Sequence, residues 1–264
     1  MEKIRPLLAE VPATLLVPLW ARAEEQKRPD PLVRDPRSAE ILRALDFDFS
    51  RFSGGWMSQL GCCIRTVILD REVQRFLDAH PGSTVINLGC GLDTRVGRLS
   101  GYAHWYDLDL PEVIALRSHF FTETEQRHMI ASSVLDSGWM ERIMAPGPVL
   151  VIAEGLFMYF SEEEVTSLLD ALARYFPKAV LLVEMLAPLL VGRNRMHDVV
   201  KNASFKWTLS DSRDFSRLNS RLHYDCEWSY FDMARRRWRY LRLIHWIGWV
   251  RRNMNNRIVR LHFE

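Results

Sequence analysis

A glycine turn and the acidic residues downstream of it are the part of the sequence best suited to chemistry. The apolar run STVINL leads into Gly89-Cys90-Gly91, where a ligand can approach the backbone closely because glycine has no Cβ. About one strand-helix unit later HWYDLDLP ends in Asp109, and the run VLVIAEGLF reaches Glu154 at its end. Neighbouring parallel strands end at one edge of a sheet, so we expect these groups to surround one ligand.

Carboxylates at these positions favour a cationic ligand that carries a ribose and disfavour a phosphate. Asp109 could accept hydrogen bonds from both ribose hydroxyls, while Asp107, on the same strand face, could contact the ligand or orient the glycine turn. S-adenosylmethionine has a positive sulfonium and ammonium, a ribose, and a carboxylate for which Arg65 and Arg95 are available. The competing interpretation is that the acids only cap helices or form salt bridges.

Other ligand classes fit the sequence less well. A dinucleotide fingerprint needs a third glycine where Thr94 stands, which disfavours a nicotinamide-dependent oxidoreductase, and no GKS or GKT follows to make a phosphate-binding loop. The four cysteines, two of them adjacent as Cys62 and Cys63, lack the spacing of a zinc site or a disulfide framework. We therefore expect no metal.

The surrounding pattern predicts an α/β fold. Short β-branched and apolar runs alternate with helical patterns, which is typical of a mostly parallel sheet covered by helices on both faces. The runs are STVINL, AHWYDLDL, HMIASSVL, PVLVIAEGL, AVLLVEML and a final RIVRLHF, with PEVIALRSHFF and SEEEVTSLLDALARYF as helices and a long helix before the first strand. We expect a helical cap over residues 1–60, a ligand-binding domain over 61–264, and an inserted lid at about 187–230.

Composition limits the partners and the compartment. The chain has 264 residues and a formal net charge of +2, so no wide basic surface indicates a nucleic-acid partner. No apolar run approaches the roughly 18 residues of a membrane span, and no signal peptide is recognisable. We expect a cytoplasmic protein without a membrane or nucleic-acid partner. The sequence does not indicate the oligomeric state.

An arginine- and tryptophan-rich run near the end, ARRRWRYLRLIHWIGWVRRN, allows three interpretations. The first is a nucleic-acid or membrane surface. The second, which we favour, is a helix beside the sheet on which long arginine stems pack over aromatic rings. The third is a basic rim that guides an anionic substrate.

Four segments in their order and spacing resemble the leucine carboxyl methyltransferase family: VINLGCGLDTRVGRL, YDLDLPEVI, ASSVLD and VIAEGLFMYFSEEEV. The similarity is greater to its bacterial and fungal polyketide O-methyltransferase branch, the tetracenomycin type, and it covers nearly the whole chain. It implies a Rossmann-like class I methyltransferase fold, with a mostly parallel seven-stranded sheet whose last strand is antiparallel. It also implies S-adenosylmethionine as the methyl donor.

The resemblance carries roles to matching residues. Arg65 would hold the carboxylate of the donor, Asp109 its ribose and Glu154 its amino end, while Tyr159 would lie beside the acceptor. Ser133 and Val134 would flank the adenine, although the leucine methyltransferases of the family have an acid where Ser133 stands. The full set expected to bind the donor is Arg65, Asn87, Gly89, Gly91, Asp93, Thr94, Arg95, Asp107, Asp109, Ser133, Val134 and Glu154.

Methyl transfer from a sulfonium is an in-line displacement that needs alignment more than a side-chain nucleophile. Cys90 is then only a small turn residue. A phenol acceptor would benefit from a general base, for which Tyr159, His197 and His223 are candidates, whereas a carboxylate acceptor needs none.

We expect an S-adenosylmethionine-dependent O-methyltransferase that acts on a small carboxylic acid or phenol, such as a polyketide-type metabolite. The alternatives are methylation of a protein carboxyl terminus and binding of the donor without turnover.

Overall fold

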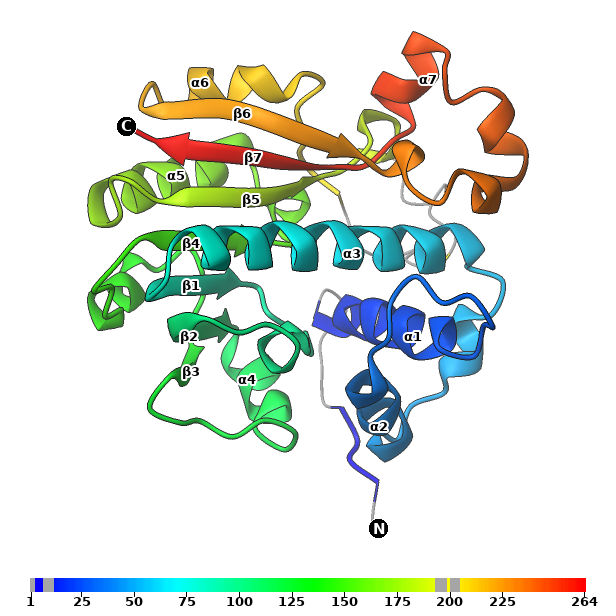
Figure 1. Ribbon diagram of the computed structural model, residues 1–264, viewed down its shortest axis with the longest axis horizontal. Coiled ribbons are helices and arrows are strands. Elements are labelled where there is room, and N and C mark those ends of the chain that lie inside the picture. Colours follow the sequence, from blue (N-terminus) through cyan, green and yellow to red (C-terminus); the bar gives the residue numbers. More distant parts are fainter. Residues whose placement is uncertain (1–2, 7–11, 193–198, 200–204) are drawn as a thin grey trace.

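The computed structural model describes residues 3–6, 12–192, 199 and 205–264. Its centre is a seven-stranded sheet in the order β3-β2-β1-β4-β5-β7-β6 (Figure 1). The strands are β1 (Ser83–Leu88), β2 (Tyr102–Asp109), β3 (Arg127–Ala131), β4 (Val149–Ala153), β5 (Val180–Met185), β6 (Leu222–Ser229) and β7 (Arg257–Phe263). The first five are parallel, and β7 runs antiparallel to β5 and β6. The predicted α/β fold with an antiparallel last strand is confirmed.

Helices cover both faces of this sheet because the central strands are apolar on both sides. In β4, Val149, Val151 and Ala153 belong to one core cluster, while Leu150 and Ile152 belong to the other. Helix α5 packs on the first face and α3 on the second. The helices are α1 (Leu16–Glu25), α2 (Pro36–Ala44), α3 (Trp56–Ala79), α4 (Pro111–Arg117), α5 (Glu162–Tyr175), α6 (Phe215–Leu218) and α7 (Gly248–Asn253).

Local signals explain where α5 begins. The Ser161 hydroxyl accepts from the Glu164 amide, and the Glu164 carboxylate accepts from the Ser161 amide, which completes a capping box. Three glutamates in the first turn also interact favourably with the helix dipole. The sequence signal SEEE therefore acts as expected.

The N-terminal segment packs against the sheet domain through α3. Helices α1 and α2 share a core cluster with Cys62 and Cys63 of α3, and both lie beyond the carboxyl ends of the parallel strands (Figure 1). The expected boundary at residue 60 falls inside α3, which begins at Trp56. Because α3 contributes to both cores, the cap and the sheet domain share this helix.

The insertion after β5 is shorter than the sequence predicts. It was expected to reach about residue 230, but residues 222–229 form β6 (Leu222–Ser229), an edge strand of the sheet in which buried and more exposed residues alternate. Polar residues such as Asp225 and Glu227 occupy its exposed positions and hide the apolar pattern of a strand. Residues 193–198 and 200–204 of the insertion lie outside the described residues.

The arginine-rich run is not one helix. It forms a 3₁₀ segment (Arg235–Leu243), interrupted at Arg239 with φ 50°, and then α7. Ala234 also has a positive φ. Trp238 and Leu241 of this segment are buried in the core beside α3.

Candidate functional site

A cavity of about 510 Å³ opens where the parallel strands end. Residues that follow β1, β2, β3 and β4, together with the end of β5, line it, and α1 and residues 230–241 contribute to its wall. The strand order reverses between β1 and β4, and open α/β sheets bind ligands at such a point. The volume is typical of a small-molecule site.

The glycine turn brings backbone to the cavity surface. Gly89 and Gly91 both line the cavity and have φ angles of +63° and +48°. A Cβ on Gly89 would lie 2.9 Å from Cδ1 of Leu156, and one on Gly91 would lie 3.1 Å from Cβ of Leu15. Both positions thus need glycine for backbone conformation and for space.

Asp109 lies at the end of β2 with its carboxylate on the cavity wall. Its Oδ2 accepts from the Gly91 amide at 2.7 Å, and its Oδ1 accepts from the Leu110 amide at 2.8 Å. Burial raises the pKa of Asp109. Among the described residues no Lys, Arg or His forms an ion pair with it, so its remaining lone pairs can accept from a ligand.

Asp107 holds the glycine turn rather than facing the cavity. Arg117, which is fully buried, pairs with Asp107 at 2.6 Å and donates to the carbonyl oxygens of Gly91 (3.0 Å) and Asp93 (2.8 Å). Asn87 Nδ2 lies 3.0 Å from Asp107 Oδ1. Of the two roles open to Asp107 in the sequence, the geometry supports orientation of the turn.

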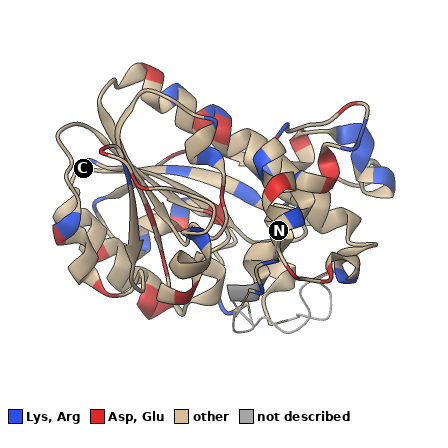
Figure 2. Ribbon diagram, turned by 90° about the horizontal axis from the view of Figure 1, so that it is seen from below, with Lys and Arg blue, Asp and Glu red and all other residues tan. Residues whose placement is uncertain are grey.

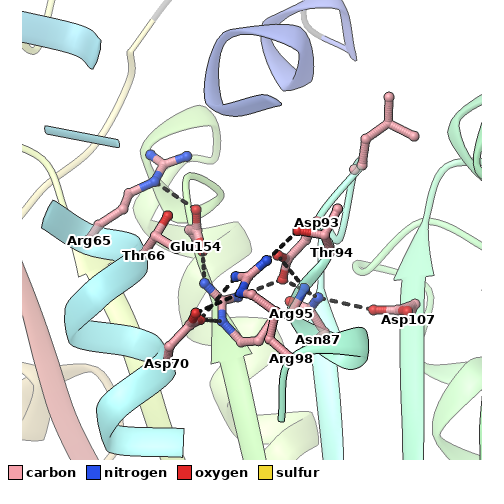
Figure 3. A network of polar contacts seen from close by, with 12 residues as sticks. Arg65, Thr66, Asp70, Asn87, Asp93, Thr94, Arg95, Arg98, Asp107 and Glu154 are labelled. Carbon is pink, nitrogen blue, oxygen red and sulfur yellow. Dashed lines mark hydrogen bonds and ion pairs between the residues drawn. The ribbon is translucent and has the colours of Figure 1, made fainter. Parts of the chain in front are cut away.

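A largely buried network of arginines and acids borders the cavity, which Asp93 and Glu154 line (Figure 3). Arg95 Nη2 lies 2.8 Å from Glu154 Oε2, and the other nitrogens of Arg95 bind Asp70 at 2.6 Å and Asp93 at 2.5 Å. Burial alone would lower the pKa of Arg95, but these three carboxylates raise it above its ordinary value. The arginine remains charged and fixes the acids around it.

The network also corrects an expectation about Thr94 and Arg95. Neither residue lines the cavity, and both are buried. The Thr94 hydroxyl donates to Asp35 at 2.6 Å, and all three nitrogens of the Arg95 guanidinium bind carboxylates. Because their polar groups are occupied by protein, we assign them to support of the turn rather than to contact with the donor.

Arg65 joins the ends of β4 and β5 at the cavity surface. Its Nε lies 2.7 Å from Glu154 Oε1, and its Nη1 lies 2.9 Å from Glu184 Oε2. Burial alone would raise the pKa of Glu154, but the guanidinium groups of Arg65 and Arg95 lower it. The structure gives Nη2 of Arg65 no partner among the described residues, so this nitrogen can bind an anionic group of a ligand.

Glu184 is a site residue that sequence reasoning missed. It is the last residue but one of β5, near the end of the run AVLLVEML, lines the cavity, and accepts a 2.8 Å hydrogen bond from the Tyr230 hydroxyl. The signal was present, because an acid at the end of a buried strand is the same feature that indicated Glu154.

The remaining candidates differ in position. Ser133 and Val134 line the cavity beyond β3, and Tyr159 lines it beyond β4 with its hydroxyl 3.2 Å from Thr14 Oγ1. Burial raises the pKa of Tyr159. His223 lies on β6, paired with Glu264 and away from the cavity, which removes it as a base. His197 lies outside the described residues.

An apolar region forms another part of the wall. Met158, Leu186 and Phe205 make a buried cluster against which Tyr159 and Leu190 pack, and all five residues line the cavity. Within the described part of the chain, no group of three or more His, Cys, Asp or Glu side chains could hold a metal ion. No described helix is long and apolar enough to cross a membrane.

Comparison with known proteins identifies the family. A profile of the leucine carboxyl methyltransferases matches residues 16–173. The chain belongs to this family. It is 31% identical, over 85% of each chain, to the tetracenomycin polyketide synthesis O-methyltransferase TcmP of Streptomyces glaucescens. It is also 31% identical to the S-adenosyl-L-methionine-dependent methyltransferase dpfgK of Gibberella zeae, over 67% of this chain and 65% of the relative.

Solved structures agree on the fold. A protein from Thermobifida fusca assigned to the methyltransferases has a TM-score of 0.56 at 13% identity and covers 92% of this chain and 94% of its own. Magnesium protoporphyrin IX methyltransferase from Synechocystis, with bound S-adenosylmethionine, has a TM-score of 0.50 at 12% identity and covers 88% and 99%. The chain is thus a class I methyltransferase of the leucine carboxyl methyltransferase family, and S-adenosylmethionine is its methyl donor.

Proposed function

We propose that this methyltransferase transfers the methyl group to an oxygen of a small, largely apolar carboxylic acid or phenol of polyketide type. The observation that carries the proposal is the apolar region formed by Met158, Leu186 and Phe205 within the same cavity as the glycine turn and Asp109. A cavity with one polar and one apolar region suits a polar donor beside an apolar acceptor. The relative TcmP, named for a polyketide O-methyltransferase, supports this acceptor class.

The polar residues fit the donor. Gly89 and Gly91 leave room for its methionyl part, where a Cβ would meet Leu156 or Leu15. The Asp109 carboxylate would accept hydrogen bonds from the ribose hydroxyls. Each of its oxygens accepts one backbone hydrogen bond, and no cation among the described residues pairs with it, so each oxygen has a lone pair left for a hydroxyl. Ser133 and Val134 would flank the adenine at the β3 end.

Arg65 and Glu154 would hold the amino-acid end of the donor. Nη2 of Arg65, which has no partner in the described part of the chain, suits a carboxylate. Glu154, whose lowered pKa keeps it ionised, suits the ammonium. Arg95 keeps Glu154 in place from below. When bound, S-adenosylmethionine supplies an electrophilic methyl group on its sulfonium.

The chain would contribute alignment and a dry site rather than a nucleophile. Tyr159 joins the region after β4 to the N-terminal segment through Thr14, so its hydroxyl helps to close the cavity. Since burial raises its pKa, Tyr159 stays protonated near neutral pH and is suited to donate a hydrogen bond, not to act as a base.

The test is incubation of the purified protein with methyl-labelled donor, an extract of small acids and phenols, and a separate pool of proteins. The proposal predicts label in the small-molecule pool, and treatment with alkali then separates methyl esters, which hydrolyse, from aryl methyl ethers, which do not. Label only in polypeptide would replace the proposal with protein carboxyl methylation. Bound donor without any labelled product would leave a binding protein without turnover.

A further inference from the structure

An exposed apolar surface lies on the segment between β6 and β7. Of the nine large hydrophobic side chains exposed among the described residues, five lie within residues 240–249. They are Tyr240, Leu243, Trp246, Ile247 and Trp249, of which Trp246 is 74% and Trp249 60% exposed. Soluble proteins rarely expose apolar groups at this density without a partner.

The segment is firmly attached, so these side chains are not a displaced part of the core. Trp238, Leu241 and Val250 are buried in the core beside α3, and the Trp238 indole donates to the carbonyl oxygens of Tyr230 and Met233. The buried residues therefore anchor the segment to the core, while the exposed apolar residues between them face the solvent.

The same segment is strongly basic. Residues 232–253 contain seven arginines and one acid, Asp232. Asp232 pairs with Arg251 and lies 3.7 Å from Arg235, while Arg236 and Arg252 are exposed. Figure 2 shows basic positions gathered at the right-hand end of the molecule, the end at which this segment projects in Figure 1.

From the sequence we favour an interpretation in which arginine stems of this run pack over aromatic rings, and the structure supports it only in part. Arg239 lies over the Trp56 ring at 4.6 Å, and Arg237 pairs with Glu25 at 2.5 Å. No cation-π contact covers Trp246 or Trp249 among the described residues. These two indoles need another environment.

We propose that residues 235–252 dock the enzyme on an anionic lipid surface. Exposed tryptophans and aliphatic side chains beside arginines match the interfacial region of a bilayer, where indole rings lie at the headgroup level and arginines bind anionic headgroups. The proposal takes up the membrane-surface interpretation of this run and departs from the expectation that no membrane is a partner. The attachment is to the surface, not across the bilayer.

The docking segment also borders the cavity. Tyr240 is exposed yet lines the cavity, as do Trp238 and Leu241 on the inner side of the segment. An acceptor dissolved in the lipid could then enter beside Tyr240. This second step rests on the proposed function, because it requires the acceptor to be apolar, whereas docking itself does not.

Sedimentation of the full chain with vesicles tests the docking directly. The protein should bind vesicles that contain about 30% phosphatidylserine, bind phosphatidylcholine vesicles more weakly, and dissociate at high salt. Trp246→Ala with Trp249→Ala should weaken binding about tenfold or more. The matched control, Met144→Ala with Tyr175→Ala, removes exposed apolar groups elsewhere and should bind like the wild type.

The charge is tested by Arg235→Glu with Arg236→Glu, which should abolish the preference for anionic lipid. The matched control is Arg213→Glu with Arg217→Glu, two exposed arginines outside the docking segment. All variants should retain donor binding, which separates this test from that of the proposed function. No binding to anionic vesicles would overturn docking, as would equal loss in the controls. A dimer that the tryptophan variant abolishes would assign the surface to a second copy instead.

Discussion

Asp109 is a cavity carboxylate that burial makes harder to ionise. Its pKa is raised in the free protein, and hydrogen bonds from the ribose hydroxyls would stabilise the ionised form. The donor thus binds the ionised form of Asp109, so protonation of Asp109 weakens donor binding. Donor affinity should be highest above the raised pKa and should fall as the pH drops through it, earlier than for an exposed aspartate.

The measurement is the affinity for adenosylhomocysteine between about pH 8 and pH 4.5. Asp109→Asn should bind more weakly throughout and lose this pH dependence. A pH profile that is unchanged in Asp109→Asn would assign the proton to another group.

Tyr159 allows a sharp distinction between positioning and base catalysis. Tyr159→Phe keeps the ring against Phe205 and removes the hydrogen bond to Thr14. We expect a loss of about threefold to tenfold in kcat/KM, carried mainly by the KM of the acceptor, because one hydrogen bond contributes roughly 1 kcal/mol. Donor affinity should not change. A fall in kcat by about a hundredfold or more would instead make Tyr159 the general base.

At the scale of elements, the turn after β1 decides whether backbone can reach the donor. Gly89→Ala places a Cβ at φ +63°, 2.9 Å from Leu156 Cδ1, and should reduce stability by about 1–2 kcal/mol and donor affinity more strongly. Gly97→Ala is the matched control, because Gly97 has an ordinary φ and open space around its Cβ position. Denaturant unfolding and calorimetry measure both effects. Equal behaviour of the two variants would remove the turn from the site.

The arginine network couples α3, β1 and β4 beneath that turn. Arg95→Met would remove a buried guanidinium and leave the partly buried carboxylates of Asp70, Asp93 and Glu154 without their shared partner, so the free energy of unfolding should fall by about 3–5 kcal/mol. Arg213→Met, at an exposed arginine, should change it by less than about 0.5 kcal/mol. A loss equally small for Arg95 would show that the network relaxes without cost.

For the molecule as a whole, the sequence predicted what depends on local pattern. Hydrophobic periodicity and the spacing of the glycines predicted the strands, the glycine turn and the acids at the strand ends. These features depend on residues that are close together in the sequence. Arg117 could not be predicted, since its partners Gly91 and Asp107 meet it only after α4 packs beside β2. Strand β6 was missed because an edge strand can carry polar residues on its exposed side.

Residue roles were harder to predict than residue positions. Arg95 and Asp107 were recognised as part of the site, but the ion pairs that withdraw them from the cavity come from α3 and α4. The exposure of Trp246 and Trp249 could likewise not be predicted from the sequence, because composition alone does not tell which face of a segment packs on the core.

The central claim is that the cavity at the strand ends binds S-adenosylmethionine through Asp109. Its most direct test is calorimetric titration of adenosylhomocysteine into the wild type, Asp109→Ala, and the control Asp136→Ala, which removes a carboxylate that caps a turn outside the cavity. We predict one site per chain in the wild type and the control, and a loss of about tenfold to a hundredfold or more in Asp109→Ala with the fold intact. Absence of binding to the folded wild type, or unchanged affinity in Asp109→Ala, would contradict it.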